Sequence, residues 1–311
     1  MERHPILKVK DLNIKFSQFD RGLKRKTLEV ISDLDIDLHE GEILAVVGSS
    51  GSGKSLLAHA ILDLLPENAE STGTFIYQGK ELSISDKQAL RGKAWVLVPQ
   101  SVNYLDPLLK VRQQIEITMP PEAVKRGLVG KWLGKYGLSK AVEAMYPFQL
   151  SGGMARKVLL TTALATEAKV IIADEPTPGL DEASLKAVLK DLRALADTGC
   201  AVLMITHDID AALQVADQIA IFYAGTTVEV AHASDFEGEG ELLRHPYTRA
   251  LYDALPTRHF RAIKGTQPAL HARGQGCLFA ERCNRSVDKC RTHMPATKNL
   301  RNGKVKCHDA T

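Results

Sequence analysis

Gly48-Ser49-Ser50-Gly51-Ser52-Gly53-Lys54-Ser55 is the stretch that decides the fold of this chain. It fits the pattern G-x-x-x-x-G-K-[S/T] and lies between an apolar run, residues 43–47, and a segment with helical spacing, residues 55–65. Glycines let the backbone curl so that successive N–H groups face one cavity, and a helix N-terminus favours an anion there. The motif predicts a phosphate-binding loop, with Lys54 on the β- and γ-phosphates and Ser55 on Mg²⁺.

A second apolar run, residues 170–173, is followed by two carboxylates, Asp174 and Glu175. Ligands of open parallel sheets bind at the carboxyl ends of the strands, and adjacent carboxylates there need a cation or protons to offset their charge. We expect Asp174 to hold Mg²⁺, directly or through water. We expect Glu175 to polarise the attacking water as general base.

Further runs of the same kind predict the core of the fold. Residues 201–205 and 219–223 are apolar throughout, and segments with helical spacing precede them at residues 185–195 and 209–216. Such repeated alternation of strand and helix is typical of an α/β fold whose sheet is mostly parallel.

Two other regions have different patterns. Residues 6–16 and 28–38 alternate apolar and polar side chains, which predicts an antiparallel β subdomain with one wet face. Residues 106–165 carry prolines between stretches of helical spacing such as 123–132 and 154–165, which indicates a mainly helical insert.

The composition narrows the class of protein. The 311 residues suggest about two domains. Lys and Arg number 40 against 37 Asp and Glu, and aromatic residues make up 5%, which argues against a nucleic-acid binder with a broad basic or base-stacking surface. No uncharged apolar run is long enough to predict a spanning helix, and the N-terminal residues do not resemble a signal segment, so we expect a cytosolic chain.

The C-terminal tail is rich in cysteine. Four cysteines follow the spacing C-x5-C-x6-C-x16-C at Cys277, Cys283, Cys290 and Cys307, whereas Cys200 stands apart and is expected in the core. In a reducing compartment, clustered cysteines indicate a metal site or free thiols. Zinc sites more often use paired C-x2-4-C knuckles, and iron–sulfur clusters tolerate irregular spacings, so zinc, a cluster and free thiols all stay open.

The order of motifs resembles the ATP-binding cassette (ABC) ATPases over residues 6–231. The matching segments, in chain order, are residues 48–55, Gln100, Leu150-Ser151-Gly152-Gly153-Met154, residues 170–175, Gly179-Leu180-Asp181 and Ile205-Thr206-His207-Asp208. The segment at 150–154 is the family's signature, which other phosphate-loop enzymes lack. The resemblance implies a P-loop NTPase cassette with a mostly parallel core, an antiparallel β subdomain and a helical insert.

The resemblance also implies roles for single residues. Gln100 would sense Mg²⁺ and the γ-phosphate and link the core to the helical insert, and His207 would contact the γ-phosphate. Asp181 would belong to the loop that crosses to a partner cassette, and Ser151, Gly152, Gly153 and Met154 would face the nucleotide of that partner. Phe16 matches the position on which the family stacks adenine. The implied ATP-binding set is Phe16, Ser49, Ser50, Gly51, Ser52, Gly53, Lys54, Ser55, Gln100 and His207; the Mg²⁺ set is Ser55, Gln100 and Asp174; the catalytic set is Glu175, His207 and Gln100.

A second resemblance covers nearly the whole chain. Residues 223–225, 245–248, 254–256 and 276–283 look like the peptide/nickel importer ATPases, the oligopeptide and dipeptide permease group. It implies a cassette at 1–231, with its helical subdomain at about 106–165, and a small Cys-rich C-terminal domain at 232–311. Carried over from that group, Cys277, Cys283, Cys290 and Cys307 would ligate a [4Fe–4S] cluster, with zinc as the alternative.

The same resemblance implies the partners and the place of work. A second, different cassette, two membrane permease subunits and a substrate-binding protein would complete the importer at the cytoplasmic face of the cell membrane, with no nucleic acid. The chain departs from the family where Thr177-Pro178 and Gly179 precede Asp181, which changes the conformations open to that loop. The alternative function is that of a soluble, non-transport ABC ATPase in nucleic-acid repair or translation. Those proteins usually carry two cassettes, coiled-coil insertions or basic segments, which this chain lacks.

Overall fold

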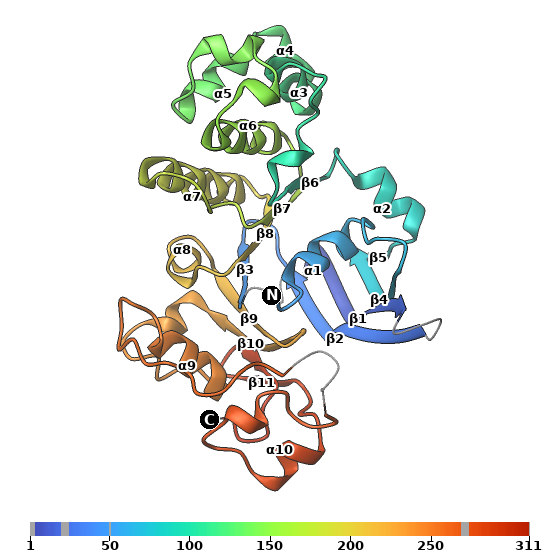
Figure 1. Ribbon diagram of the computed structural model, residues 1–311, viewed down its shortest axis with the longest axis vertical. Helices are drawn as coiled ribbons and strands as arrows, with labels where there is room; N and C mark the ends of the chain where they lie inside the picture. Colours follow the sequence, from blue (N-terminus) through green and yellow to red (C-terminus); the bar gives the residue numbers. More distant parts are fainter. Residues whose placement is uncertain (1–3, 20–24, 50, 269–273, 311) are drawn as a thin grey trace. The chain divides into compact units, whose positions relative to one another are not determined.

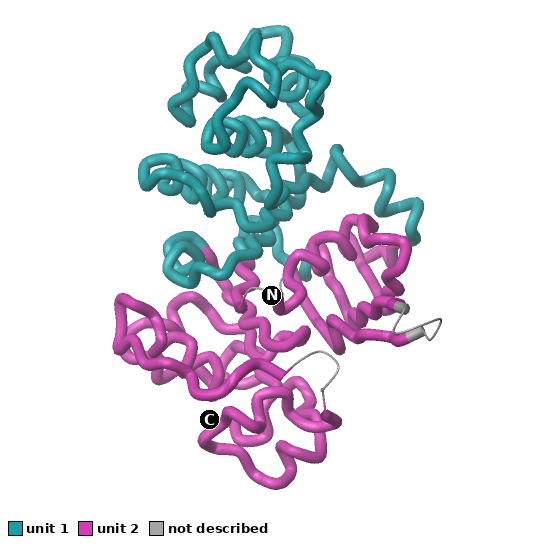
Figure 2. The backbone as a smooth tube through the Cα atoms, viewed as in Figure 1, with its two compact units in different colours: residues 1–5, 38–43, 83–215 teal, residues 6–37, 44–82, 216–311 magenta. Residues whose placement is uncertain are grey.

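The chain forms two compact units, each built from separate segments of the sequence (Figure 2). The computed structural model describes residues 4–19, 25–49, 51–268 and 274–310. Unit 1 comprises residues 1–5, 38–43 and 83–215. Unit 2 comprises residues 6–37, 44–82 and 216–311, so it joins the N-terminal strands to the C-terminal tail. The domain boundary expected at residue 231 coincides with neither unit and stays a prediction.

The phosphate-loop strand belongs to a sheet of unit 2. Strand β3 (Ile43–Gly48) is buried at every position and pairs in parallel with β9 (Gln218–Tyr223), as its uninterrupted apolar run predicts. Helix α1 (Lys54–Ile61) follows the loop. The helix ends four residues before the predicted end at residue 65, because Asp63 adopts a left-handed conformation with φ of 52°.

The alternating segments form the predicted antiparallel sheet. Its order is β2-β1-β4-β5, and its strands are β1 (Leu7–Phe19), β2 (Arg25–Leu38), β4 (Ala69–Tyr77) and β5 (Lys80–Glu81). The pairing of β1 with β4 shifts register between Lys10 and Asn13. Gly73 lies opposite this bulge, where a Cβ atom would approach the Lys10 carbonyl oxygen to 2.8 Å, so only glycine fits.

The C-terminal tail adds strands to the sheet of β3 and β9. Strand β10 (Thr226–His232) pairs antiparallel with β9 on one side and with β12 (Gly303–Val305) on the other, and β11 (Lys298–Leu300) pairs with β12. The intervening helices are η4 (Ala233–Phe236), α9 (Pro246–Asp253), η6 (Ala280–Arg282) and α10 (Asp288–Thr292) (Figure 1). The sheet order within unit 2 is thus β11-β12-β10-β9-β3.

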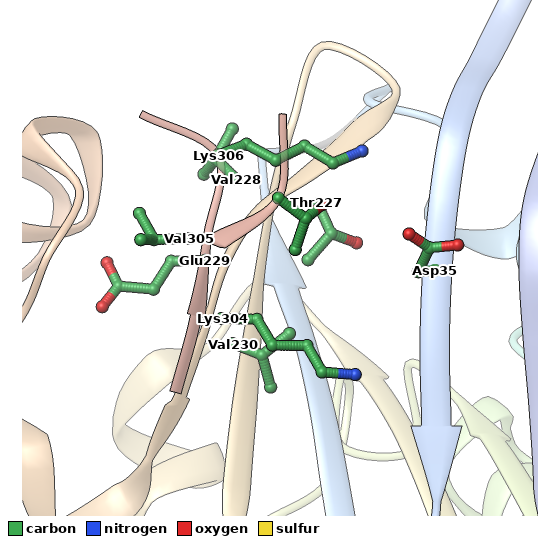
Figure 3. A pocket seen from close by; sticks show the side chains of 9 residues that line it. Asp35, Thr227, Val228, Glu229, Val230, Lys304, Val305 and Lys306 are labelled. Carbon is green, nitrogen blue, oxygen red and sulfur yellow. The ribbon is translucent and has the colours of Figure 1, made fainter. Parts of the chain in front are cut away.

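Lysines hold β12 close to the N-terminal strand β2 (Figure 3). Figure 3 shows the side chains of Lys304 and Lys306 extending toward the strand that carries Asp35. The ammonium of Lys304 is paired with the carboxylate of Asp37, and that of Lys306 donates to the backbone carbonyl of Asp33. Asp35 and Lys306 line the cavity between these strands. Burial lowers the pKa of Lys306, and the carboxylate of Asp35 partly offsets that shift.

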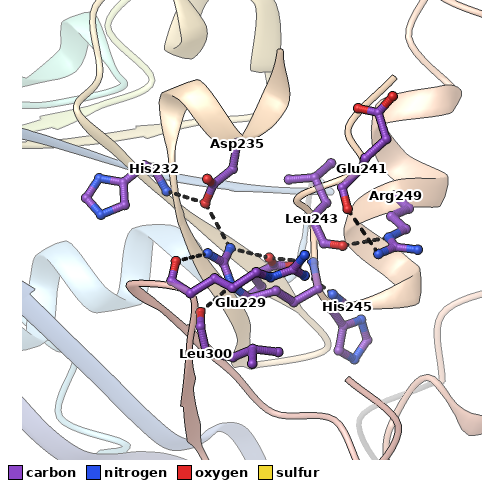
Figure 4. A network of polar contacts seen from close by, with 10 residues as sticks. Glu229, His232, Asp235, Glu241, Leu243, His245, Arg249 and Leu300 are labelled. Atoms are coloured by element: carbon purple, nitrogen blue, oxygen red, sulfur yellow. Dashed lines mark hydrogen bonds and ion pairs between the residues drawn. The ribbon is translucent and has the colours of Figure 1, made fainter. Parts of the chain in front are cut away.

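A buried guanidinium connects four segments of unit 2 (Figure 4). Arg244 and Glu229 are fully buried, and Arg244 Nη1 lies 3.2 Å from Glu229 Oε1 and 2.8 Å from Asp235 Oδ2. The same guanidinium donates to the backbone carbonyls of Leu300 and Arg301, at the turn between β11 and β12. Each charge is therefore paired and hydrogen-bonded, the condition under which burial of charge is tolerated.

Unit 1 contains the other predicted parallel strands and the helical insert. Strands β8 (Ala201–Thr206), β7 (Val170–Asp174) and β6 (Trp95–Val98) pair in parallel in that order, and β7 and β8 are buried throughout. The helices of the αβ connections are α2 (Ile84–Leu90), α7 (Glu182–Asp197) and α8 (Ile209–Leu213).

Between β6 and β7 the described elements are all helical. They are η1 (Val102–Tyr104), α3 (Val111–Thr118), α4 (Pro121–Lys125), α5 (Val129–Lys135), η2 (Lys140–Ala144), η3 (Pro147–Gln149) and α6 (Gly152–Leu164), and they bury a core of their own. The expectation of continuous helical structure over residues 123–132 is wrong: α4 and α5 are separate, because Gly127 has φ of 63° and ends the first helix. Across the described residues no helix combines the length and apolarity needed to cross a bilayer.

Replacing Arg244 by Met should destabilise the protein by about 3 to 5 kcal/mol, because Glu229 would stay buried without its cation. Urea unfolding measures this. The matched control is Arg112→Met, at an exposed pair with Glu116, which should change stability little. Equal effects of the two substitutions would show that the buried network does not stabilise the fold.

Candidate ATP-binding and hydrolysis site

The phosphate loop closes on its own backbone. Lys54 Nζ donates to the carbonyl oxygens of Gly48 at 2.8 Å and Ser49 at 3.0 Å, and Ser52 Oγ donates to Ser49 O at 2.7 Å. Gly51 and Gly53 have φ of 75° and 98°, conformations that side chains rarely adopt. The curled backbone expected from the glycines is therefore present. Ser50 lies outside the described residues.

Two further residues of unit 2, Ser55 and Phe16, are predicted to bind the nucleotide. Ser55 is half-buried in the first turn of α1, the position from which a hydroxyl can serve a cation beside the phosphates. Phe16 is half-buried on β1, opposite Ala69 of β4. Its ring thus keeps some exposed surface, as a stacking platform requires.

Unit 1 brings together Glu175 and His207. Glu175 follows the last residue of β7, its N–H donates to the carbonyl of Ile205 at 2.8 Å, and its carboxylate lies 2.9 Å from Nδ1 of His207. Asp174 and Glu175 are buried, whereas the His207 side chain is 53% exposed. Glu175 also has a φ of 48°, which is strained for a residue other than glycine.

Arg156 organises this region and was not among the residues expected from the sequence. It is buried on α6, and its Nη1 donates to the carbonyls of Pro99 at 2.7 Å and Gln100 at 2.6 Å. Its Nη2 donates to the carbonyl of Glu175. Burial lowers the pKa of this guanidinium, and the carboxylates of Asp174 and Glu175 offset that effect. One side chain therefore fixes the backbone of both Gln100 and Glu175.

The signature segment lies at the N-terminus of the thirteen-residue helix α6. Ser151 is the N-cap and accepts a hydrogen bond from the N–H of Met154 at 3.3 Å. Gly152 and Gly153 are exposed, and a Cβ atom at either would meet nothing within 4 Å. The segment thus presents backbone N–H groups of a helix N-terminus on an open surface, as an anion site requires.

Asp181 caps helix α7. Its carboxylate accepts a hydrogen bond from Ser184 N at 2.9 Å and lies 3.0 Å from Lys157 Nζ. The hydrogen bond from the Ser184 backbone lowers the pKa of Asp181 most, and the contact with Lys157 lowers it further. The unusual Gly179 before it has φ of 76°, within a turn in which the Leu180 N–H donates to the Thr177 carbonyl. The sequence before Asp181 thus differs from the family pattern, but Asp181 itself still forms an ordinary helix N-cap.

The four tail cysteines line one cavity of unit 2, together with Phe279 and Ala280. Gly276 allows their segments to cross, since a Cβ there would lie 2.4 Å from the Cys290 carbonyl oxygen. Burial raises the pKa of the thiols of Cys277, to about 11, and of Cys283 and Cys307. Cys200 is separate and buried, as expected. Within the described ranges, no three His, Cys, Asp or Glu side chains gather closely enough to hold a single metal ion.

Replacing Arg156 by Gln should lower the kcat of ATP hydrolysis about 10- to 100-fold while ATP affinity stays near that of wild type. The reason is that Arg156 holds the backbone of Gln100 and Glu175, two residues of the expected catalytic set. Steady-state turnover and nucleotide titration separate the two effects. Arg112→Gln, on the exposed face of α3, is the control; a kcat for Arg156→Gln equal to that of the control would contradict the assignment.

Two protein-family models match this chain. The model described as "ABC transporter" matches residues 31–178, which include the phosphate loop, Gln100, the signature and the carboxylates Asp174 and Glu175. The model described as "Oligopeptide/dipeptide transporter, C-terminal region" matches residues 228–290, which include three of the four tail cysteines.

Curated relatives match over almost the whole length. The "Oligopeptide transport ATP-binding protein OppD" of Haemophilus influenzae is 32% identical, with 92% of each chain covered. The "Dipeptide transport ATP-binding protein DppD" of Bacillus subtilis is 32% identical, with 91% of this chain and 88% of the relative covered.

Solved structures agree on the fold. A dimer of the ATP-binding cassette MJ0796, in a post-hydrolysis state bound to ADP and phosphate, has a TM-score of 0.63 at 24% identity and covers 73% of this chain and 98% of that one. This likeness shows the P-loop ABC cassette fold. The relatives and the family models establish that the chain is an ATPase and belongs to the family of oligopeptide and dipeptide ABC transporter ATP-binding proteins.

Proposed function

We propose that this chain hydrolyses ATP to power the uptake of peptides through an ABC importer. The observation that carries the proposal is the combination, in one chain, of the complete ordered set of cassette motifs with a tail that matches the oligopeptide/dipeptide C-terminal region. Relatives named as oligopeptide and dipeptide transport proteins support peptides as the cargo. The alternative cargo is nickel or a metal chelate, and an uptake experiment distinguishes it from peptides.

The contacts within each unit support separate roles for its residues. In unit 2, the N–H groups of the phosphate loop and the ammonium of Lys54 would bind the β- and γ-phosphates, with adenine on Phe16. In unit 1, Glu175 would accept the proton of the water that attacks the γ-phosphorus, and His207 would position that carboxylate and the γ-phosphate. Ser55, Gln100 and Asp174 would hold Mg²⁺, which neutralises charge on the phosphates.

Dimerisation would complete each site. The exposed glycines after Ser151 leave the N–H groups of α6 accessible, so a second cassette could receive them on its γ-phosphate. ATP binding would then close the pair of cassettes, and hydrolysis would reopen it. We infer a different chain as the second cassette, two permease subunits and a substrate-binding protein as further partners, and a position at the cytoplasmic face of the membrane.

The tail supports a further part of the proposal. We infer that residues 232–311 form a C-terminal domain of the oligopeptide/dipeptide type, after a cassette at residues 1–231. Its Cys277, Cys283, Cys290 and Cys307 line one cavity, and the thiols fit a [4Fe–4S] cluster by number and softness. Zinc, which thiolates also bind, is the alternative. When bound, the cluster would supply folding free energy to a tail with little core of its own.

The non-transport alternative receives no support from the comparisons. The relatives named above are transport proteins, and they match this chain along more than nine-tenths of its length.

The helical insert from α3 to α6 is the part through which the permeases would sense the ATP site. Arg156 of α6 joins this insert to Gln100 by a hydrogen bond to its backbone carbonyl.

Replacing Glu175 by Gln should preserve ATP binding but lower hydrolysis at least about 100-fold, because the amide cannot accept the proton of water. In membrane vesicles carrying the assembled complex, uptake of labelled oligopeptide should fall with it. Glu167→Gln, at an exposed residue, is the matched control. Wild-type turnover in Glu175→Gln would remove Glu175 as the base, and ATP-dependent uptake of a nickel chelate but not of peptide would correct the cargo.

Anaerobically purified protein should be brown and contain about four irons per chain. Cys283→Ala should lose most of this iron, because it removes one ligand, whereas Cys200→Ala should retain it, since Cys200 is buried elsewhere. Iron analysis and visible absorbance measure both. Colourless, iron-free protein loaded with zinc would contradict the cluster.

A further inference from the structure

A glutamine of the C-terminal tail contacts the phosphate loop. Ser49 Oγ donates a hydrogen bond to Oε1 of Gln267 at 2.9 Å, across 218 residues of sequence and within unit 2. Neither the cassette motifs nor the cysteine spacing singles out Gln267. The tail therefore contributes directly to the loop on which nucleotide binding depends.

Ser49 is the residue around which the loop closes. Its carbonyl accepts hydrogen bonds from Lys54 Nζ at 3.0 Å and from Ser52 Oγ at 2.7 Å, and the Ser52 N–H also points to it at 3.3 Å. A bond that fixes the Ser49 side chain thus restrains the residue that orients the lysine and the N–H groups. Restraining a binding loop before the ligand arrives reduces the ordering cost paid on binding.

The segment that carries Gln267 is itself anchored. Arg282 Nε donates to the carbonyl of Lys264 at 2.9 Å, and its Nη2 donates to the carbonyl of Ile263 at 3.3 Å. Gly265, with φ of 76°, packs against the aliphatic part of the same arginine, where a Cβ would lie 3.3 Å from Arg282 Cγ. Arg282 in turn donates to the hydroxyl of Tyr223, at the end of β9. Gln267 is therefore presented from a segment tied to the sheet that carries the loop.

We propose that Gln267 is a positioning residue for the phosphate loop, so that the C-terminal tail sets part of the affinity for ATP. The proposal rests on the ATP site described above and adds to it a residue supplied from outside the cassette motifs. Gln267 acts through Ser49, not on the reacting atoms. Its side chain has the acceptor that the serine hydroxyl needs, and it is neutral, so it adds no negative charge beside the phosphates.

Nucleotide titration of the full-length chain with a fluorescent ATP analogue tests the proposal. Gln267→Ala should raise the Kd about three- to tenfold, the loss expected for one neutral hydrogen bond, while the kcat at saturating ATP in the assembled complex stays unchanged. Gln267→Glu keeps the acceptor but places a charge near the phosphates. It should raise the Kd further, and this added effect should shrink at high salt.

A double-mutant cycle separates this role from a general effect on folding. If Gln267 acts through Ser49, Ser49→Ala with Gln267→Ala should bind ATP no more weakly than the weaker single variant, because both remove the same bond. Gln275→Ala, an exposed glutamine of the same tail, is the matched control and should bind like wild type. Urea unfolding of Gln267→Ala should match that of the control.

Failure of this proposal differs from failure of the proposed function. If the wild-type chain bound no nucleotide, or if Lys54→Ala bound as tightly as wild type, the ATP site itself would be wrong. If the wild type binds and Lys54→Ala does not, an unchanged Kd in Gln267→Ala overturns the positioning role. A lower Kd in Gln267→Ala also overturns it, since the contact would then obstruct the site. Additive effects of the two substitutions would exclude action through Ser49.

Discussion

The close approach of two backbones at Gly48 is the constraint on which the nucleotide site depends. A Cβ atom at this position would lie 2.4 Å from the carbonyl oxygen of Phe222, so β3 can pair with β9 up to its last residue only if that residue is glycine. The pairing fixes where the strand ends and the loop begins. Because Lys54 donates to the carbonyl of the same glycine, the position of the ammonium follows from the register of the sheet.

Each unit also depends on one buried guanidinium. Arg156 holds the backbones of Gln100 and Glu175, and Arg244 holds Glu229 and the turn at Leu300. Both side chains use the planar fork of arginine, which holds its donors in a fixed geometry, to reach several acceptors from different segments. The apolar cores define the layers of the fold, whereas these two cations determine which loops meet.

Local patterns predicted the elements well because strands and helices are specified by nearby residues. The apolar runs at β3, β7, β8 and β9 are strands of the parallel pairings, and Gly51 and Gly53 of the phosphate loop have the positive φ values expected of a curled backbone. What the sequence did not reveal are bonds between distant segments. Arg156 resembled any basic residue on a helix, since Lys157 follows it directly, and Gln267 lies in a stretch without apolar periodicity. The roles of the site residues stay predictions until the variants are measured.

Unit 2 combines N-terminal segments with the C-terminal tail, so it cannot finish folding on the ribosome until the tail has been synthesised. Lys304, which pairs with Asp37, is made 267 residues after it, an interval of about 13 to 53 s at about 5 to 20 residues per second. Once β10 (Thr226–His232) has been made, its edge has no β12 to cover it until Gly303–Val305 follow. Nascent chains therefore expose an unpaired strand edge until β12 is made, so protection by chaperones during translation would affect the yield of this subunit more than that of a cassette without such a tail.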